Sequence, residues 1–367
     1  MSKVLSRTEE RATVPSIIYK SLADCIGNTP VVEINSSLIP EDKRLLVKLE
    51  YCNPGFSIKD RTALGLVKAA MRSGKLEKGG ILIESTSGNL GKSLAMLGAV
   101  YGFRVIVVID VKTSPSVMRW CQAFGAQMEI VSETDENGGY QKTRVARVKQ
   151  LLELYPGAVW PNQYDNEDNP AFHSATTGEE IAALDVDVVV GSVSTGGHLC
   201  GISRKVKEKK PGATVIACDV EGSAVFGGTF HSYLVNGSGL SWRSRNTDIS
   251  VLDKICILSD QEAISACRLL AKESGLLVGG SSGLVLCGSI AWLRQTSAKS
   301  VVAIIPDSGV NYLDQIYNDE WLDQKGIKLL DHNELAEHLR TKRICDVREY
   351  CPEQPADREL GHFAGAL

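Results

Sequence analysis

Asn-Pro-Gly-Phe-Ser-Ile-Lys-Asp-Arg, residues 53–61, is the stretch from which the rest of this chain can be interpreted. Its Asn53-Pro54-Gly55 triplet is typical of a turn, and the residues that follow predict a helix with Lys59 in its first turn. A lysine at that place lies near the positive end of the helix dipole, which favours the neutral amine that can attack a carbonyl group. Taken alone, the stretch more often holds an ordinary solvated lysine, so other parts of the chain must decide between the two interpretations.

Two other loops connect an apolar strand to a helix and suit the binding of anions. Residues 84–91 read Glu-Ser-Thr-Ser-Gly-Asn-Leu-Gly, and residues 193–198 read Val-Ser-Thr-Gly-Gly-His. Small hydroxyl residues and glycines leave backbone N–H groups open at a helix N-terminus, which suits a substrate carboxylate in the first loop and a phosphate in the second. A Ser or Thr that merely caps the helix is an equally good interpretation of the first loop, and many strand-to-helix turns look like the second. The candidate carboxylate-binding residues are Ser85, Thr86, Ser87 and Gly88.

Short apolar runs alternate with helical patterns along most of the chain. Buried strands rich in Val and Ile and separated by helices predict an α/β protein built from βαβ units, with parallel sheets flanked by helices. The expected strands are 81–84, 105–109, 128–131, 186–190, 214–218 and 301–305. The expected helices include 62–71, 91–101, 116–124 and 142–154.

Composition and charge narrow the class of protein. The chain has 367 residues, 43% of them apolar and 23% charged, with a net charge of −4, so we expect a globular protein that binds neither nucleic acid nor membrane. The first twenty residues carry charges and no long apolar run, which argues against a signal peptide and predicts a cytoplasmic protein. Ten cysteines without a CxxC pair and six scattered histidines predict reduced, mostly buried thiols and no metal site.

Five runs of sequence resemble the motifs of one enzyme family, and they occur in the family's order between about residues 20 and 320. They are residues 26–30 (Ile-Gly-Asn-Thr-Pro), 53–61, 85–91, 161–181 and 279–283 (Gly-Gly-Ser-Ser-Gly). The family is the β-family of fold-type II pyridoxal-phosphate enzymes, which includes cysteine synthases and cystathionine β-synthases. The resemblance implies pyridoxal 5′-phosphate as the cofactor and a two-lobed architecture like that of the tryptophan synthase β-subunit.

The resemblance also implies a role for each matching residue. Lys59 would hold the cofactor as a Schiff base and, once free, would remove the substrate's α-proton as general base. Asn89 would hydrogen-bond the cofactor's 3′-oxygen, and Ser281 would face its pyridine nitrogen. Because a neutral serine does not force that nitrogen to stay protonated, the ring is a moderate electron sink suited to β-elimination and replacement. The cofactor phosphate would be held by Ser194, Thr195, Gly196, Gly197 and His198.

Two residues depart from the family pattern. His198 stands where a threonine or serine is usual in the phosphate loop, and its imidazole could be either a cation that strengthens phosphate binding or a neutral packed ring. Phe56 stands where cysteine synthases often have a small residue, and we expect it to narrow the mouth of the site.

Within this family the chain most resembles the N-(2-amino-2-carboxyethyl)-L-glutamate synthases. The similarity includes Leu90 after Asn89, the Gly138-Gly139-Tyr140 and Thr143-Arg144 runs, residues 162–164 (Asn-Gln-Tyr), Ser194, and the runs at 305–309 and 312–314. It implies condensation of O-phospho-L-serine with L-glutamate, for the L-2,3-diaminopropionate used in siderophore biosynthesis.

The proposed donor substrate makes a demand on the site. A phosphate leaving group carries about two negative charges near neutral pH, so its site should present an arginine. Arg144 is the candidate, against the alternative of a solvated helix arginine paired with Glu153. Gln163, Tyr164 and Ser194 are further candidates for contact with substrate, although Tyr164 could simply pack beside the cofactor.

Two alternative functions stay open on the sequence alone. A cysteine synthase or a cystathionine β-synthase-like enzyme would differ only in leaving group and nucleophile. A noncatalytic regulatory or binding protein on the same scaffold is a different class, and the presence of Lys59, Asn89 and Ser281 argues against it.

The resemblance divides the chain into four parts. An N-terminal segment at 1–47 would join the larger lobe, a small mobile lobe would occupy 48–160, the larger lobe 161–325, and a C-terminal extension 326–367. Beyond about residue 330 the sequence is polar, which predicts a peripheral extension. The cofactor is expected in the cleft between the lobes, and the family implies a homodimer.

Overall fold

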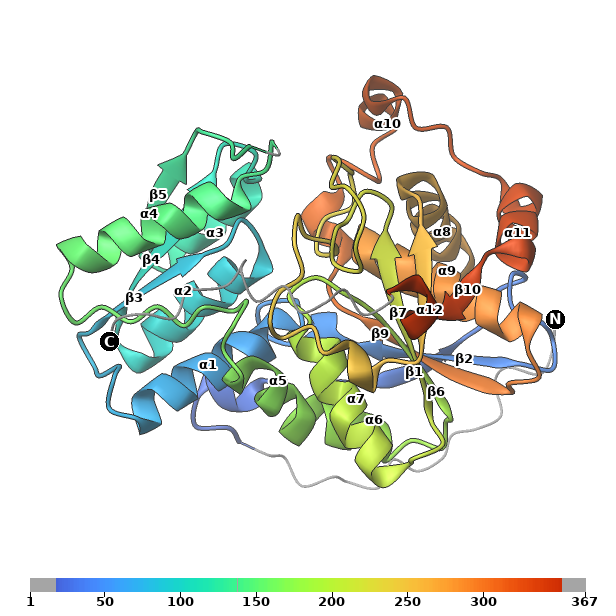
Figure 1. Cartoon of the computed structure of the whole chain (residues 1–367), viewed down its shortest axis with the longest axis horizontal. Helices are drawn as coiled ribbons and strands as arrows, with labels where there is room; N and C mark the ends of the chain where they lie inside the picture. The colour runs from blue at the N-terminus through green and yellow to red at the C-terminus, as the bar shows by residue number, and fades with distance from the viewer. Residues whose placement is uncertain (1–17, 137, 352–367) are drawn as a thin grey trace.

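Two β-sheets organise the fold. The computed structural model describes residues 18–136 and 138–351, and Figure 1 shows the smaller sheet with its helices on the left and the larger sheet on the right. Within the described residues, the larger sheet has the strand order β1-β2-β9-β6-β7-β8-β10 and the smaller sheet has the order β3-β4-β5. The strands are β1 (Val31–Ile34), β2 (Arg44–Leu49), β3 (Ile81–Ser85), β4 (Arg104–Asp110), β5 (Gln127–Val131), β6 (Val188–Ser192), β7 (Thr214–Val220), β8 (Lys254–Leu258), β9 (Ser300–Ile305) and β10 (Ile344–Asp346).

The strand predictions are confirmed, each within two residues of the expected bounds. The inner strand pairs of the larger sheet and both strand pairs of the smaller sheet are parallel, as the Val- and Ile-rich runs predicted. The outer pairs of the larger sheet, β1 with β2 and β8 with β10, are antiparallel. An edge strand such as β1 is largely exposed and lacks a continuous apolar run, so no clear pattern predicted it.

The four expected helices are also present, and capping residues explain several helix ends. Ser114 caps α3 with Pro115 at its first position, and Ser259 and Glu262 form a capping box at the start of α8. The longer helices are α1 (Lys59–Arg72), α2 (Asn89–Tyr101), α3 (Pro115–Ala123), α4 (Gln141–Leu154), α7 (Gly197–Lys209), α8 (Asp260–Ser274), α9 (Gly280–Gln295) and α11 (His332–Thr341). The shorter ones are α5 (Asp168–His173), α6 (Glu179–Ala182), α10 (Asp319–Lys325), α12 (Val347–Tyr350), a π-helical segment η3 (Ser174–Gly178), and the 3₁₀ turns η1 (Leu22–Cys25), η2 (Glu50–Cys52), η4 (Ile249–Val251) and η5 (Gly309–Tyr312).

The core between the larger sheet and its helices is filled with aliphatic side chains and thiols. The cysteines expected to act as small buried hydrophobes are buried, namely Cys200, Cys218, Cys256, Cys267 and Cys287 here and Cys121 in the core of the smaller sheet. All ten cysteines lie within the described residues and have free thiols. In this part of the chain, no helix has the length and apolar character needed to span a bilayer, and no three His, Cys, Asp or Glu side chains are grouped so as to hold a metal ion.

Residues 332–350 differ from the peripheral extension expected at the C-terminus. They form α11, β10 and α12, and β10 extends the larger sheet by pairing with β8. Leu335 and Leu339 of α11 are fully buried in the core of that sheet. The two leucines are one helical turn apart on a single face, so a mostly polar composition concealed a packed amphipathic helix. Residues 352–367 lie outside the described part of the chain.

The predicted division into lobes stays a prediction, as does the homodimer. The smaller sheet and helices α2, α3 and α4 all lie between residues 48 and 160, whereas β2 crosses the first predicted boundary. Figure 1 shows α1 and α5 beneath the region between the two sheets.

A buried ion-pair network anchors the start of α1. Arg61 Nε lies 2.8 Å from Glu50 Oε2, and Arg61 Nη1 lies 2.6 Å from Glu180 Oε1. Lys48 Nζ donates to the other oxygen of Glu180 at 2.6 Å. Arg61 and Glu50 are almost completely inaccessible to water, so each needs the other's charge. The network therefore fixes the helix that begins at Lys59 against β2 and α6.

Candidate active site

One cavity collects most of the residues that the sequence singled out. It has a volume of about 220 Å³ and is lined by the loops after β3, β6 and β9 and by the starts of α1, α2 and α9. A crevice at the carboxyl ends of parallel strands is a usual ligand site. The expected residues that line it are Lys59, Thr86, Ser87, Gly88, Asn89, Arg144, Gln163, Tyr164, Ser194, Thr195 and Ser281. The expected residues that do not line it are Ser85, Gly196, Gly197 and His198.

Lys59 is the first residue of α1 and follows a well-fixed turn. Phe56 N–H donates to the Asn53 carbonyl at 2.9 Å, and Gly55 N–H donates to the Asp60 carboxylate at 2.5 Å. Lys59 keeps part of its surface open to the cavity but is surrounded by protein, and this burial lowers the pKa of its amine to about 8. Lys59 is therefore not the solvated lysine of the alternative interpretation.

The reaction of Lys59 with pyridoxal phosphate is expected to become faster as the pH rises through about 8. The neutral amine is the nucleophile, and a lowered pKa makes that form available at a lower pH than in an ordinary lysine. Stopped-flow absorbance of the cofactor-free protein mixed with the cofactor at a series of pH values would measure the midpoint. A midpoint close to the unperturbed lysine value of 10.5 would contradict the enclosure of Lys59 by protein.

The loop before α2 presents backbone groups rather than capping hydroxyls. Gly88 occupies the cap position of α2, and no side chain among the described residues caps this helix. Thr86 Oγ1 instead accepts from Gly88 N–H at 3.3 Å. The N–H groups of a first helical turn have no carbonyl partner within the helix, so those beside Ser87 and Gly88 are available to an anion. The interpretation of this loop as an ordinary Ser or Thr helix cap is therefore not supported.

The loop between β6 and α7 has room only for glycine at two positions. Gly196 has a φ of +78°, and a Cβ atom there would lie 2.5 Å from Thr247 Oγ1. A Cβ atom at Gly197 would lie 2.2 Å from Asn169 Oδ1. The two glycines let the chain turn tightly into α7. Ser194 and Thr195, which come just before them, line the cavity, so the N-terminus of α7 lies beside the cavity wall.

His198 is a buried and neutral ring. The pKa of its imidazole is lowered to about 3. Burial is the main cause, and the nearby charge of Lys59 is the second. Its ring centroid lies 6.2 Å from that of His173, which is also buried and whose pKa is also lowered. Of the two interpretations of His198, the structure supports neutral packing, so a phosphate at this loop would use backbone N–H groups rather than an imidazolium.

Ser281 lies in the first turn of α9 with its hydroxyl group enclosed. It is 1% exposed, and its Oγ has no hydrogen-bond partner among the described residues. A Cβ atom added to Gly237, which also lines the cavity, would lie 3.2 Å from this oxygen. Because an enclosed hydroxyl without a partner is unfavourable, Ser281 is suited to hydrogen-bond a ligand in the cavity.

Arg144 is buried on α4 instead of being solvated. It is 5% exposed, and its Nη1 lies 3.1 Å from Asp110 Oδ2. Its Nε and Nη1 have no hydrogen-bond partner among the described residues. Asp110 therefore holds the guanidinium in place through the ion pair at Nη1, while Nε is left without any partner in the described part of the chain and is available to an anion in the cavity. The alternative of a solvated Arg144 paired with Glu153 is not found.

Gln163 and Tyr164 line the cavity from the segment before α5. Gln163 Nε2 already donates to the Ser85 carbonyl at 3.0 Å, so this side chain ties the segment to the end of β3. Tyr164 is buried, and its ring centroid lies 5.3 Å from that of Trp242. Both residues thus have packing roles in addition to facing the cavity.

Two parts of the site were missed by sequence reasoning. Asp307 and the loop at 236–240 both line the cavity, and neither had been given a role. Asp307 follows directly after the apolar run of β9, and this position was a usable signal because functional side chains gather at the carboxyl ends of parallel strands. No pattern in the sequence marked the loop at 236–240.

The residues of this cavity fit the cofactor implied by the resemblance. Lys59 provides an enclosed amine of lowered pKa, and Ser281 provides an enclosed hydroxyl without a partner. Asn89 lines the same cavity, and Ser194 and Thr195 lead into a helix N-terminus. Pyridoxal phosphate needs this combination of an amine, polar contacts at the ring and an anion site.

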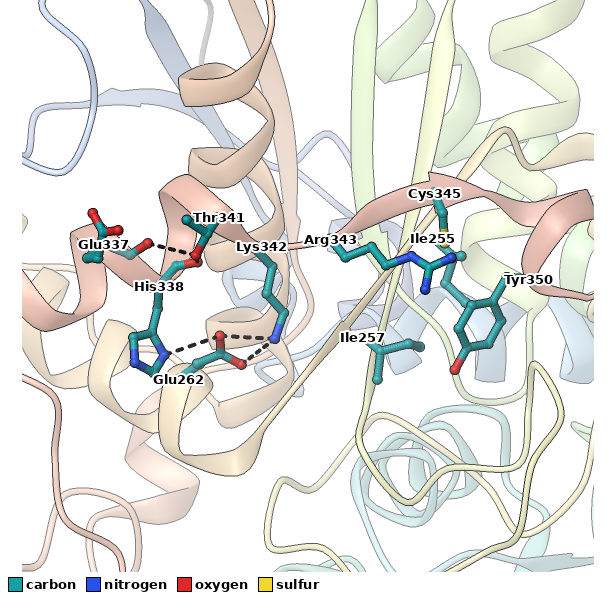
Figure 2. Close-up of a pocket in the computed structure, with 10 residues that line it drawn as sticks. All are labelled: Ile255, Ile257, Glu262, Glu337, His338, Thr341, Lys342, Arg343, Cys345 and Tyr350. Atoms are coloured by element: carbon teal, nitrogen blue, oxygen red, sulfur yellow. Dashed lines mark hydrogen bonds and ion pairs between the residues drawn. The ribbon is translucent and has the colours of Figure 1, made fainter.

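A larger cavity elsewhere in the molecule lacks this chemistry. It has a volume of about 430 Å³ and lies between β8, α11 and the segment that follows α11 (Figure 2). Lys342 Nζ donates to both carboxylate oxygens of Glu262, at 3.0 and 2.7 Å, and Figure 2 shows His338 beside the same carboxylate. The wall also includes Ile255 and Ile257. This larger cavity is therefore a groove between packed helices and strands. The larger volume does not make it the better candidate for the reactive site.

Comparisons with known proteins find similarity along most of the chain. A family model described as "Pyridoxal-phosphate dependent enzyme" matches residues 22–307. A relative from Ralstonia nicotianae, N-(2-amino-2-carboxyethyl)-L-glutamate synthase, is 39% identical over 310 residues, which cover 83% of this chain and 92% of the relative.

Solved structures of related fold include a cysteine synthase and a cystathionine beta-synthase. The cysteine synthase of Entamoeba histolytica is 30% identical with a TM-score of 0.79, and the match covers 94% of this chain and 98% of that one. An O-acetylserine dependent cystathionine beta-synthase from Helicobacter pylori is 31% identical with a TM-score of 0.76, and the match covers 83% of this chain and all of that one.

Proposed function

This chain belongs to the family of pyridoxal-phosphate dependent enzymes, and on that premise we propose that it condenses O-phospho-L-serine with L-glutamate. The products would be N-(2-amino-2-carboxyethyl)-L-glutamate and phosphate, for L-2,3-diaminopropionate biosynthesis. Membership of this family makes the chain a pyridoxal-phosphate dependent β-replacement enzyme, so a noncatalytic scaffold protein is no longer a competing interpretation. The identity of the leaving group and of the nucleophile is the proposed part.

Arg144 is the main support for phosphoserine as the donor. Its guanidinium lies in the wall of the cavity, with Nε and Nη1 free of hydrogen bonds to the described residues. A phosphate that leaves as a dianion gains from such donors, whereas a neutral ester group such as acetyl would leave them unsatisfied. The name of the Ralstonia relative supports the same donor and nucleophile.

The other residues of the cavity suit the remaining steps. When bound, the cofactor supplies an electron sink for the α-carbon. Lys59, with a pKa of about 8, keeps a neutral fraction near neutral pH and can accept the α-proton and return it. The N–H groups at the start of α2 would bind the α-carboxylate. Tyr164 and Ser194 line the same cavity and would contact the incoming glutamate.

Mass spectrometry of the products tests the proposal. The cofactor-loaded enzyme mixed with O-phospho-L-serine and L-glutamate is expected to give the condensed amino acid and one phosphate per product. Omission of glutamate is the control, and it should abolish the condensed product. Phosphate release without condensation would keep the donor and overturn glutamate as the nucleophile. Absence of any reaction with phosphoserine would overturn the proposal.

A cysteine synthase or a cystathionine β-synthase-like enzyme is the second candidate. Two of the structural relatives bear those names, and they share the fold at about 30% identity. O-acetylserine with sulfide, assayed in parallel with the same enzyme preparation, separates the two candidates. Faster turnover of O-acetylserine than of phosphoserine would favour this second function.

A further inference from the structure

Asp307 lies where the starts of α1, α2 and α9 meet. The carbonyl of the preceding residue, Pro306, accepts from Ile58 N–H at 2.8 Å, immediately before α1. The Asp307 carbonyl accepts from Gly279 N–H at 3.3 Å, at the cap of α9. The Asp307 side chain contacts Asn89, the first residue of α2. The two residues after β9, Pro306 and Asp307, are thus joined to the three helix starts that line the reactive cavity.

The Asp307 carboxylate fixes the amide group of Asn89. Asp307 Oδ2 accepts from Asn89 Nδ2 at 2.8 Å and from Tyr312 Oη at 2.6 Å, and the residue is 2% exposed. A carboxylate that receives two donated hydrogen bonds requires the nitrogen, and not the oxygen, of the Asn89 amide to face it. One N–H of Asn89 Nδ2 is then committed to Asp307, and the second remains for an acceptor oxygen in the cavity.

The other oxygen of Asp307 is held in a tight and dry place. A Cβ atom at Gly279 would lie 2.1 Å from Asp307 Oδ1, so only glycine leaves room for the carboxylate. Asp307 Oδ1 has no hydrogen-bond partner among the described residues. A buried carboxylate is stable in such a place when positive charge lies nearby. Lys59 and Lys92 provide it, since Asp307 raises the pKa of both lysines and both lower the pKa of Asp307.

We propose that Asp307 is a positioning residue that orients Asn89 toward the cofactor and provides the negative charge that balances a proton on the nitrogen of Lys59. The inference rests on the proposed roles of Lys59 and Asn89 at the cofactor, and it is independent of the proposed substrates. It assigns a function to a carboxylate of the run at 305–309, which had been given no role.

Few other groups near Asp307 and Lys59 can change charge near neutral pH. Burial raises the pKa of Tyr312 far above its usual range and raises that of Cys267 to about 12, so both stay protonated. Burial keeps the imidazoles of His198 and His173 neutral. The charged groups that remain around Asp307 are Lys59 and Lys92, together with Asp60, which faces Lys92 and whose pKa is raised to about 6 by burial.

The charge is tested with the Asp307→Asn variant of the cofactor-loaded enzyme, without substrate. Asparagine keeps the shape and can still accept both hydrogen bonds, but it lacks the negative charge. Loss of an anion beside a protonated nitrogen makes protonation harder, so the pH midpoint of the cofactor's visible absorbance is expected to fall by about one pH unit. Asp314→Asn removes the same charge from an exposed residue of the same segment and should leave the midpoint unchanged. An unchanged midpoint in Asp307→Asn, or an equal shift in both variants, would overturn the charge role.

The orientation is tested with a double-mutant cycle of Asp307→Ala and Asn89→Ala, measured as the rate at which the cofactor dissociates. Asp307→Ala is expected to speed dissociation about tenfold when Asn89 is present and much less when Asn89 is already alanine, because interacting residues are not additive. Equal effects in the two backgrounds would overturn positioning through Asn89. If Asp307→Ala fails to fold in a thermal unfolding assay, the same cycle is run with Asp307→Leu, which has a similar shape but no acceptor for the Asn89 amide. Because no substrate is present, none of these outcomes depends on phosphoserine or glutamate.

Discussion

Alanine in place of Lys59 is expected to lower turnover by about 10⁴-fold or more. The substitution removes both the amine that attaches the cofactor and the base that moves the α-proton. The phosphate loop at Ser194 and Thr195 does not depend on the lysine, so the variant should fold and still bind the cofactor without a covalent bond. Borohydride reduction followed by peptide mass spectrometry measures the attachment. The wild-type peptide that contains Lys59 should carry the cofactor mass, and the variant peptide should not.

Lys68→Ala is the matched control for this prediction. Lys68 lies on the same helix, α1, but is exposed to solvent, so its removal should leave both turnover and attachment unchanged. Recovery of the cofactor mass on another lysine of the wild-type enzyme, such as the nearby Lys92, would show that the attachment site has been assigned wrongly.

Alanine in place of Arg144 is expected to lower kcat/KM for O-phospho-L-serine by about 100-fold, with a much smaller change for O-acetylserine. The loss corresponds to about 3 kcal/mol, which is typical of a charge-assisted hydrogen bond to a charged group in an enclosed site. The difference between the two donors is the informative quantity because only the phosphate carries the charge that Arg144 would bind. Initial rates at several concentrations of each donor give both constants.

Two further variants separate this role from a structural one. Arg144→Ala leaves the buried Asp110 without its partner, so the free energy of unfolding should also fall. Arg144→Lys keeps the charge, and Arg147→Ala removes a partly exposed arginine of the same helix that is paired with Glu129. Arg147→Ala should behave like the wild type. An equal loss with both donors in Arg144→Ala would mean that the arginine only stabilises the fold, and unchanged kinetics with phosphoserine would remove the main support for that donor.

Much of the candidate site could be named before the structure because its residues belong to short local motifs. Lys59, Asn89 and Ser281 each lie in the first turn of a helix that follows a recognisable run of small residues. Such turns are determined by neighbouring residues, chiefly by glycines that permit close approach and by the ends of apolar strands. Six of the strands and four of the longer helices were predictable for the same reason, since burial imposes its period on adjacent residues.

The residues that were missed or left open depend on contacts between distant segments. Asp307 and Asn89 are 218 positions apart in the chain, and no local pattern relates them. The polar composition of α11 concealed Leu335 and Leu339, which became core residues only through packing against α8 and α9. The protonation of His198 was open in the sequence and is decided by its enclosure.

By itself, then, the sequence determined the α/β class and the place of six strands and four helices, because these follow from the spacing of apolar residues. Its motifs of a few residues also pointed to the lysine of the candidate site. The tertiary structure decided which charged groups are enclosed: Arg144 against Asp110, Asp307 against Asn89, and the amine of Lys59 at a pKa of about 8. The physical reason is that desolvation and unsatisfied hydrogen bonds depend on every segment that excludes water from a group. Those segments come from all parts of the chain, and their arrangement exists only in the folded protein.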